Sequence, residues 1–302
     1  APISALSVND NCIDFYIKPG PVGKSTSIDY HPKTSFIKLK NESITVQDSV
    51  QKRLKIDRDW VLNKNNFNAY GEIIDTSDVD TLYRNIYDPS TFTGVVFKES
   101  LEKYGARVKT ISKKKTSNKS YKKISNHLSK PLIHSATNLM NESDNLTAEL
   151  FVKSIGALDT LPGTWRVGLD SIKSFLTKEV LIDTSNIRLA DASGVSRYNL
   201  TSAAQLNSLL KWMYNSLYKD DFISTLPGGG RKNSTLEKRL INEGDLVRAK
   251  TGGLSGVRNL AGYIKSKKYG DVAFSILMNG YTDYSSRYAR VHDQIVKSII
   301  YD

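Results

Sequence analysis

Hydrophobic and polar residues alternate in short runs over the first 85 positions of the chain. Two of the clearest runs are residues 12–17 (CIDFYI) and 35–39 (SFIKL). A period of two is typical of strands that bury one face. Turn-forming residues separate these runs, namely Pro19-Gly20-Pro21, His31-Pro32 and Asn41-Glu42. The first 85 residues are therefore predicted to form a β-rich module.

The hydrophobic period lengthens to that of a helix between Pro89 and Gly105. Proline favours the first turn of a helix and glycine the position just past its end, so one helix is predicted here. Further helical patterns cover residues 131–140, 146–155 (before Gly156), 169–175, 203–217 and 287–300. Three strand-like runs joined by short turns predict a small sheet, at residues 246–250, 260–264 and 272–277.

Composition narrows the classes to which this chain can belong. A hydrophobic content of 39% over 302 residues supports a folded chain of about two domains. No run approaches the roughly 18–20 apolar residues of a membrane-spanning helix, so no transmembrane segment is predicted. The single cysteine, Cys12, and four histidines without metal-ligand spacing predict neither a disulfide framework nor a metal site.

The formal charge of +12 permits an anionic partner without identifying it. The densest lysines lie between Lys113 and Lys130, in a segment rich in serine and asparagine. This segment does not show the interleaved aromatic residues with which nucleic-acid surfaces stack on bases. A solvated loop is predicted, and no nucleic-acid partner is expected.

Two short motifs carry the candidate chemistry. Ser143-Asp144-Asn145 lies at a junction between two predicted helices, and Lys250-Thr251-Gly252 ends a predicted strand. Each tripeptide alone is common in proteins. Together, in this order and setting, they resemble two signatures of the penicillin-recognising serine acyltransferases, Ser-x-Asn and Lys-Thr-Gly.

The resemblance implies a division of labour around an acyl-enzyme. The Ser143 hydroxyl, beside a lysine amine, can relay the proton that a serine nucleophile loses. Lys250 and Thr251 offer a charged, hydrogen-bonded seat for a terminal carboxylate. The backbone N–H of Gly253 is expected to be an oxyanion donor. The expected catalytic residues are Ser143, Asn145 and Lys250, and the expected substrate-binding residues are Asp144, Arg197, Thr251, Gly252 and Gly253.

Four longer blocks extend the resemblance, at residues 142–149 (ESDNLTAE), 161–166 (LPGTWR), 191–199 (DASGVSRYN) and 250–262 (KTGGLSGVRNLAG). They resemble blocks of the D-Ala-D-Ala carboxypeptidase/endopeptidase family S13, of the penicillin-binding protein 4 (DacB) type. The implied fold class is α/β (α+β), with a transpeptidase-like domain in which helices flank an antiparallel sheet. The implied domains are an inserted β-rich module over 1–85, a return segment through a second inserted module over 86–125, and the C-terminal part of the penicillin-binding domain over 126–302.

The chain departs from the family's pattern at three points. Ala192 stands where the family usually has glycine, and Gly253 where it has serine or threonine. The larger departure is the nucleophilic Ser-x-x-Lys, which is expected upstream of Ala1. Chance explains the Ser-x-x-Lys strings that do occur, among which Ser100 is the best placed, at Ser35, Ser49, Ser100, Ser112, Ser120, Ser208 and Ser216. The 302 residues alone are therefore expected to be inactive.

The resemblance implies a serine-type D-Ala-D-Ala carboxypeptidase and endopeptidase that acts on peptidoglycan stem peptides. It further implies β-lactams as ligands, a periplasmic or cell-envelope location, and no cofactor. Arg197 is expected near the pocket for the third residue of the stem peptide, where a guanidinium would pair with a free carboxylate. Two alternatives stay open: a non-catalytic peptidoglycan-binding fragment that lacks the nucleophile, and a serine β-lactamase or esterase on the same scaffold.

Overall fold

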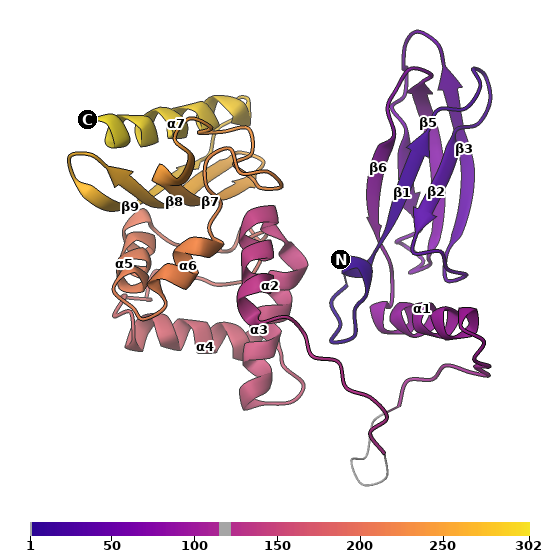
Figure 1. Ribbon diagram of the computed structural model, residues 1–302, viewed down its shortest axis with the longest axis horizontal. Helices are drawn as coiled ribbons and strands as arrows, with labels where there is room; N and C mark the ends of the chain where they lie inside the picture. The colour runs from indigo at the N-terminus through magenta and orange to yellow at the C-terminus, as the bar shows by residue number, and fades with distance from the viewer. Residues whose placement is uncertain (1, 115–121) are drawn as a thin grey trace. The chain divides into compact units, whose positions relative to one another are not determined.

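A computed structural model describes residues 2–114 and 122–302. The chain divides into two compact units, Ala1–Ile124 and Ser125–Asp302 (Figure 1). Three residues of the predicted lysine-rich loop lie outside the described residues, namely Lys115, Lys119 and Ser120. Lys115 and Ser120 also belong to two of the Ser-x-x-Lys strings.

The first unit contains two three-stranded sheets (Figure 1). One sheet has the order β2-β1-β6 and is antiparallel, with strands β2 (Ser27–His31), β1 (Cys12–Lys18) and β6 (Asp80–Asn85). The other has the order β3-β5-β4, with strands β3 (Lys38–Val46), β5 (Asn66–Ile74) and β4 (Lys55–Arg58). β3 pairs with β5 in parallel, whereas β4 pairs with β5 antiparallel. The β-rich character predicted from the alternation is present.

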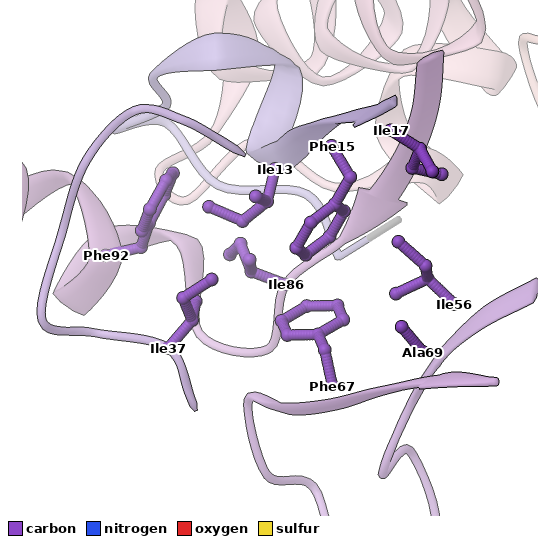
Figure 2. Close-up of a cluster of buried hydrophobic side chains, with 9 residues drawn as sticks. All are labelled: Ile13, Phe15, Ile17, Ile37, Ile56, Phe67, Ala69, Ile86 and Phe92. Atoms are coloured by element: carbon purple, nitrogen blue, oxygen red, sulfur yellow. The ribbon is translucent and has the colours of Figure 1, made fainter. Parts of the chain in front are cut away.

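The core of the first unit is made of buried side chains from both sheets (Figure 2). The rings of Phe15 on β1 and Phe67 on β5 lie 5.2 Å apart between centroids. A short 3-10 turn η1 (Asn9–Asn11) precedes β1, and the helix α1 (Pro89–Lys103) follows β6. Phe92 of α1 is fully buried in the same core, as expected of a residue on the hydrophobic face predicted for that helix.

One predicted turn in the first unit is wrong. Asn41 and Glu42 lie inside β3, not between strands. The Asn41 side chain donates to the carbonyl of Thr26 and accepts from the backbone N–H of Ser43. These tertiary contacts satisfy a polar side chain within a strand and so override its preference for turns.

The second unit is built on an antiparallel sheet with the order β7-β8-β9. Its strands are β7 (Val247–Leu254), β8 (Val257–Ser266) and β9 (Gly270–Asn279), each longer than predicted. The helix α7 (Ser285–Tyr301) covers one face, and α5 (Ala203–Tyr214) and α6 (Lys219–Thr225) lie on the other (Figure 1). The sequence patterns did not predict α6, a short helix of seven residues, or about two turns, that mixes polar and apolar residues.

Successive side chains of β7 and β8 point alternately to these two faces of the sheet. Ala249 and Leu260 pack towards α7 in one buried cluster with Val296. Ala261 and Tyr263 pack on the opposite face with Leu210 of α5. Since successive side chains alternate across a strand, Lys250 on β7 points away from α7.

The remaining helices complete the second unit. They are α2 (Leu132–Asn138), the π-helical turn η2 (Leu139–Ser143), α3 (Asn145–Asp159), α4 (Trp165–Lys178) and the 3-10 turn η3 (Gly244–Leu246). Across residues 2–114 and 122–302, no helix combines the length and apolar character needed to cross a membrane.

Gly156 does not end its helix as predicted but lies inside α3. A Cβ atom added there would lie 2.8 Å from the carbonyl oxygen of Thr164 and 3.0 Å from the nitrogen of Gly168. The glycine therefore serves close packing of α3 against α4, and the helix continues for three more residues to Asp159.

Candidate active site

All eight predicted site residues line one pocket of the second unit, with a volume of about 1230 Å³. They come from three segments: the η2–α3 junction, the loop after α4, and strand β7. We call this space the Lys250 pocket. Its residues from the predicted set are Ser143, Asp144, Asn145, Arg197, Lys250, Thr251, Gly252 and Gly253.

Ser143 ends the π-helical turn in a backbone conformation unusual for a residue with a side chain. Its φ is +60°, in the left-handed region, which costs a non-glycine residue roughly 1–2 kcal/mol. The following residue, Asp144, returns to extended backbone and caps α3. A kinked junction thus presents the Ser143 hydroxyl at the pocket instead of continuing the helix.

The cap explains why Asp144 belongs to this motif. Its carboxylate accepts from the backbone N–H of Leu146 at 2.9 Å and of Thr147 at 3.2 Å, and also from the Thr147 hydroxyl. These bonds satisfy donors that the first turn of α3 would otherwise leave free. Asp144 therefore positions its neighbours in the motif, while its contact with substrate stays a prediction.

Asn141 anchors the junction from inside. Its side chain is buried and its amide nitrogen donates to the carbonyls of Thr137 at 2.7 Å and Thr225 at 3.0 Å. The second bond ties η2 to the end of α6. Asn145, by contrast, is exposed, and its side-chain amide has no partner among the described residues. It is free to meet a ligand in the pocket.

Lys250 joins the two motifs directly. Its ammonium donates to the Ser143 hydroxyl at 2.6 Å and to the carbonyl of Thr251 at 2.9 Å. Burial lowers the pKa of Lys250 from its usual value to about 8, because the charged form loses water. The cation has only neutral acceptors here, so the site favours an anionic ligand.

β7 is an edge strand, and its outer edge borders the pocket. An isolated bridge between Arg248 and Gly228 covers the start of the strand, and the segment from Lys250 to Gly253 follows it. An extended peptide can pair with such an open edge through main-chain hydrogen bonds. Gly252 and Gly253 keep this edge free of side chains.

Arg197 reaches the pocket from the loop over residues 191–199. Its guanidinium is exposed and donates to the carbonyl of Ser255, in the β7–β8 turn, at 2.7 Å. Asp191 organises the loop by accepting from the backbone N–H groups of Gly194 and Ser196 and from the Asn199 amide. The loop thus presents one guanidinium at the rim of the Lys250 pocket.

The sequence motifs did not single out Glu149, which holds this loop against α3. Its carboxylate is buried and accepts from the Trp165 indole at 2.6 Å, from Ser193 N–H at 2.9 Å and from Ala192 N–H at 3.2 Å. A glutamate on the buried face of a helix was the only signal of this role.

The Ser-x-x-Lys strings lie in varied settings. On α1 of the first unit, the hydroxyl of Ser100 donates back to the carbonyl of Val96 at 2.8 Å. Ser208 and Ser216 make similar local bonds, to Ala204 and Met213. Within the described residues, none of these three serines lines the Lys250 pocket.

Comparison with known proteins relates this chain to a family. A model of the D-Ala-D-Ala carboxypeptidase 3 (S13) family matches residues 1–298. A D-alanyl-D-alanine carboxypeptidase from an Actinomadura species is 29% identical over 298 residues, which cover 93% of this chain and 54% of that protein. D-alanyl-D-alanine carboxypeptidase DacB from Haemophilus influenzae is 32% identical over 163 residues, or 53% of this chain and 34% of that protein.

Solved structures share the fold. Penicillin-binding protein 4 (dacB) from Haemophilus influenzae, crystallised with a β-lactam, superposes with a TM-score of 0.79 at 22% identity. The match covers 99% of this chain and 71% of that chain. The mixed α+β fold predicted from the motifs is thereby confirmed. The chain spans about half the length of the Actinomadura relative.

Replacing Glu149 tests how the loop is held. Glu149→Gln puts an amide NH₂ where an oxygen accepts, so a buried N–H loses its partner. We expect the free energy of unfolding to fall by roughly 1–3 kcal/mol in urea titrations. Glu179→Gln is the matched control, because Glu179 is exposed after α4 and should change stability by less than about 0.5 kcal/mol. Equal effects of the two variants would mean that the Glu149 bonds do not hold the loop.

Proposed function

The chain belongs to the D-Ala-D-Ala carboxypeptidase 3 (S13) family, and from this premise we propose that its protein is a serine-type D-Ala-D-Ala carboxypeptidase and endopeptidase. Its substrates are peptidoglycan stem peptides, which it cleaves through an acyl-enzyme, and β-lactams acylate the same serine. The observation that carries the proposal is the 2.6 Å hydrogen bond between Lys250 and Ser143 on the wall of the pocket.

Ser143 serves as a proton relay in this proposal. A serine nucleophile that attacks the scissile carbonyl must lose its proton, and the leaving amine must gain one. The Ser143 hydroxyl can accept and donate in turn, and Lys250 holds it in place. The nucleophile itself belongs to a Ser-x-x-Lys element outside these 302 residues.

The open edge of β7 seats the substrate. A stem peptide lies antiparallel or parallel to residues 250–253 and hydrogen bonds to their backbone, while the Asn145 amide binds the peptide from the other side. The Gly253 N–H is one donor to the oxyanion. Lys250 and the Thr251 hydroxyl hold the terminal carboxylate, which matches the cation's lack of an anionic partner.

Arg197 recognises the side chain of the third stem residue. Its exposed guanidinium uses one bond to hold the Ser255 carbonyl and keeps other donors for a ligand. A free carboxylate on that side chain, as in diaminopimelate, forms a bidentate pair with it.

The domain organisation and location follow from the same proposal. Residues 126–302 are the C-terminal part of the transpeptidase-like domain, 1–85 an inserted β-rich module, and 86–125 a return segment through a second one. The protein works in the periplasm or the cell envelope, where peptidoglycan lies. An acylation experiment distinguishes this proposal from two alternatives. These are β-lactamase or esterase activity on this scaffold, and non-catalytic binding of peptidoglycan.

Acylation by a fluorescent penicillin tests the proposal. The full-length protein should gain one covalent adduct by intact mass, and the 302-residue chain alone should gain none, because the nucleophile lies outside it. Ser143→Ala in the full-length protein should slow acylation at least about 10-fold, whereas Ser208→Ala on α5 should not. An unlabelled full-length protein would contradict the acyl-enzyme, fast release of the adduct would indicate a β-lactamase, and a labelled 302-residue chain would place the nucleophile within it.

The Lys250 charge predicts a pH dependence. Only the ammonium binds a carboxylate, and its pKa is about 8, so the second-order acylation rate constant should fall as the pH rises above about 8. Lys250→Ala should lower this constant at pH 7 by about 30- to 1000-fold, or roughly 2–4 kcal/mol, and remove the basic limb. The exposed Lys265 on β8 provides the control variant, Lys265→Ala. A basic limb that persists in Lys250→Ala would assign the titration to another group.

Substrate pairs test Arg197. Two matched stem peptides are compared, one whose third side chain ends in the amino-acid head group of diaminopimelate and one that ends in a bare amine. Arg197→Ala should lower kcat/KM for the first by about 3- to 10-fold, since an exposed ion pair contributes modestly, and should spare or improve the second. Equal losses on both peptides would show that Arg197 only holds the loop to the β7–β8 turn.

A further inference from the structure

Arg258 has no role in the function proposed above, yet its guanidinium lies beside Gly253 of β7, a residue that lines the Lys250 pocket. Arg258 stands opposite Gly253 in the antiparallel register of β7 and β8. A Cβ atom added to Gly253 would lie 3.2 Å from Arg258 Nη1. The guanidinium therefore lies over the glycine, in the space that a side chain at position 253 would take.

The strand period places Thr251 on the same face as this guanidinium. Residues 251 and 253 of β7 and residues 258 and 260 of β8 share the face towards α7, as the packing of Leu260 shows. Lys250 lies on the opposite face. A ligand at the free edge of β7 can therefore be reached by Lys250 from one side and by Thr251 and Arg258 from the other.

The Arg258 guanidinium lacks an acceptor. Among residues 2–114 and 122–302 it makes no hydrogen bond or ion pair, and its Nε atom is buried without a partner. Burial and the neighbouring Arg239 lower its pKa. The Thr251 hydroxyl has no partner within the same described residues either.

The groups around Arg258 do not neutralise it. Asp293 is already paired with Arg239, whose Nη2 lies 2.7 Å from its carboxylate. His292 is fully buried, and burial followed by the two arginines lowers its pKa to about 4, so it is neutral at pH 7. Tyr281, which lines the pocket, has a buried hydroxyl without a partner in the described chain. A half-buried cation with no acceptor is costly unless an anion binds it.

The geometry points to Arg258 as a specificity residue that binds the terminal carboxylate of the substrate across Gly253, together with the Thr251 hydroxyl. This inference rests on the proposed function, because it assigns a further residue to the carboxylate seat of that pocket. Gly253 makes this arrangement possible, because it lies on the exposed edge of β7 and its missing side chain leaves room for the guanidinium. The ligand is a carboxylate at the end of an extended peptide, or the equivalent carboxylate of a β-lactam.

Acylation of the full-length protein by benzylpenicillin and by its methyl ester tests the inference. Arg258→Gln should slow acylation by the acid about 10- to 100-fold, the range expected for a hydrogen bond to a charged group. Acylation by the ester should change by less than about 3-fold, because no carboxylate is present to be bound. The control is Arg290→Gln on α7, which removes the same charge from an exposed site and should leave both rates unchanged.

Gly253→Ala provides a second variant that leaves the arginine in place. Its methyl group would crowd the guanidinium, which must shift, and acylation by the acid should slow more than acylation by the ester. Adding Gly253→Ala to Arg258→Gln should cost little more. Equal losses with acid and ester would overturn the inference and assign Arg258 to the packing of β8 against α7. Unchanged rates with the acid would overturn it as well.

A binding measurement separates this inference from the proposed function. Calorimetry compares a peptide ending in D-Ala-D-Ala with its C-terminal carboxamide, for the full-length protein and for Arg258→Gln. If penicillin does not acylate the protein, the proposed function fails. A preference for the peptide acid that Arg258→Gln reduces by about 10-fold or more would still support the inference, since Lys250 keeps part of the preference. A preference that the substitution leaves undiminished, or none at all, would overturn it.

Discussion

The pocket depends on one hydrogen bond, from the Lys250 ammonium to the Ser143 hydroxyl, between residues 107 positions apart. The bond fixes β7 against the η2–α3 junction and so sets the distance between the two motifs. The lysine is partly buried here, and this burial lowers its pKa to about 8. Its hydrogen-bond acceptors are both neutral. The lysine that joins the two motifs therefore also favours binding of a carboxylate in this pocket.

The junction can hold Ser143 in a left-handed conformation because its neighbours determine the backbone around it. Asn141 is bonded on the inner side, and the Asp144 cap is bonded to the first turn of α3. Strain of this kind persists where the surrounding structure imposes it, and it is often found at functional sites. A flexible loop could not present the hydroxyl to Lys250 at a constant distance.

Missing side chains shape the pocket as much as present ones. Gly156 allows α3 and α4 to pack closely, which brings Glu149 and Trp165 together beneath the loop that carries Arg197. Gly253 leaves its edge of β7 open and makes room for Arg258. The cations that line the pocket are Lys250 and Arg197, while the Asp144 carboxylate is taken up by its cap of α3, so a ligand with free carboxylates would complement the pocket.

The sequence by itself predicted most of the local elements and a set of candidate site residues that the structure brings to one pocket. Its hydrophobic periods predicted α1, α3, α7 and the three strands of the second unit, because burial of one face imposes a period on each element. Its two motifs predicted that Ser143 and Lys250 share a pocket. Tertiary structure alone decided the parallel pairing of β3 with β5, the continuation of α3 through Gly156, and the bonds of Glu149. It also placed Arg258 over Gly253. These features arise from contacts between residues far apart in the chain, and a local period contains no information about which distant backbone or charge a residue will meet.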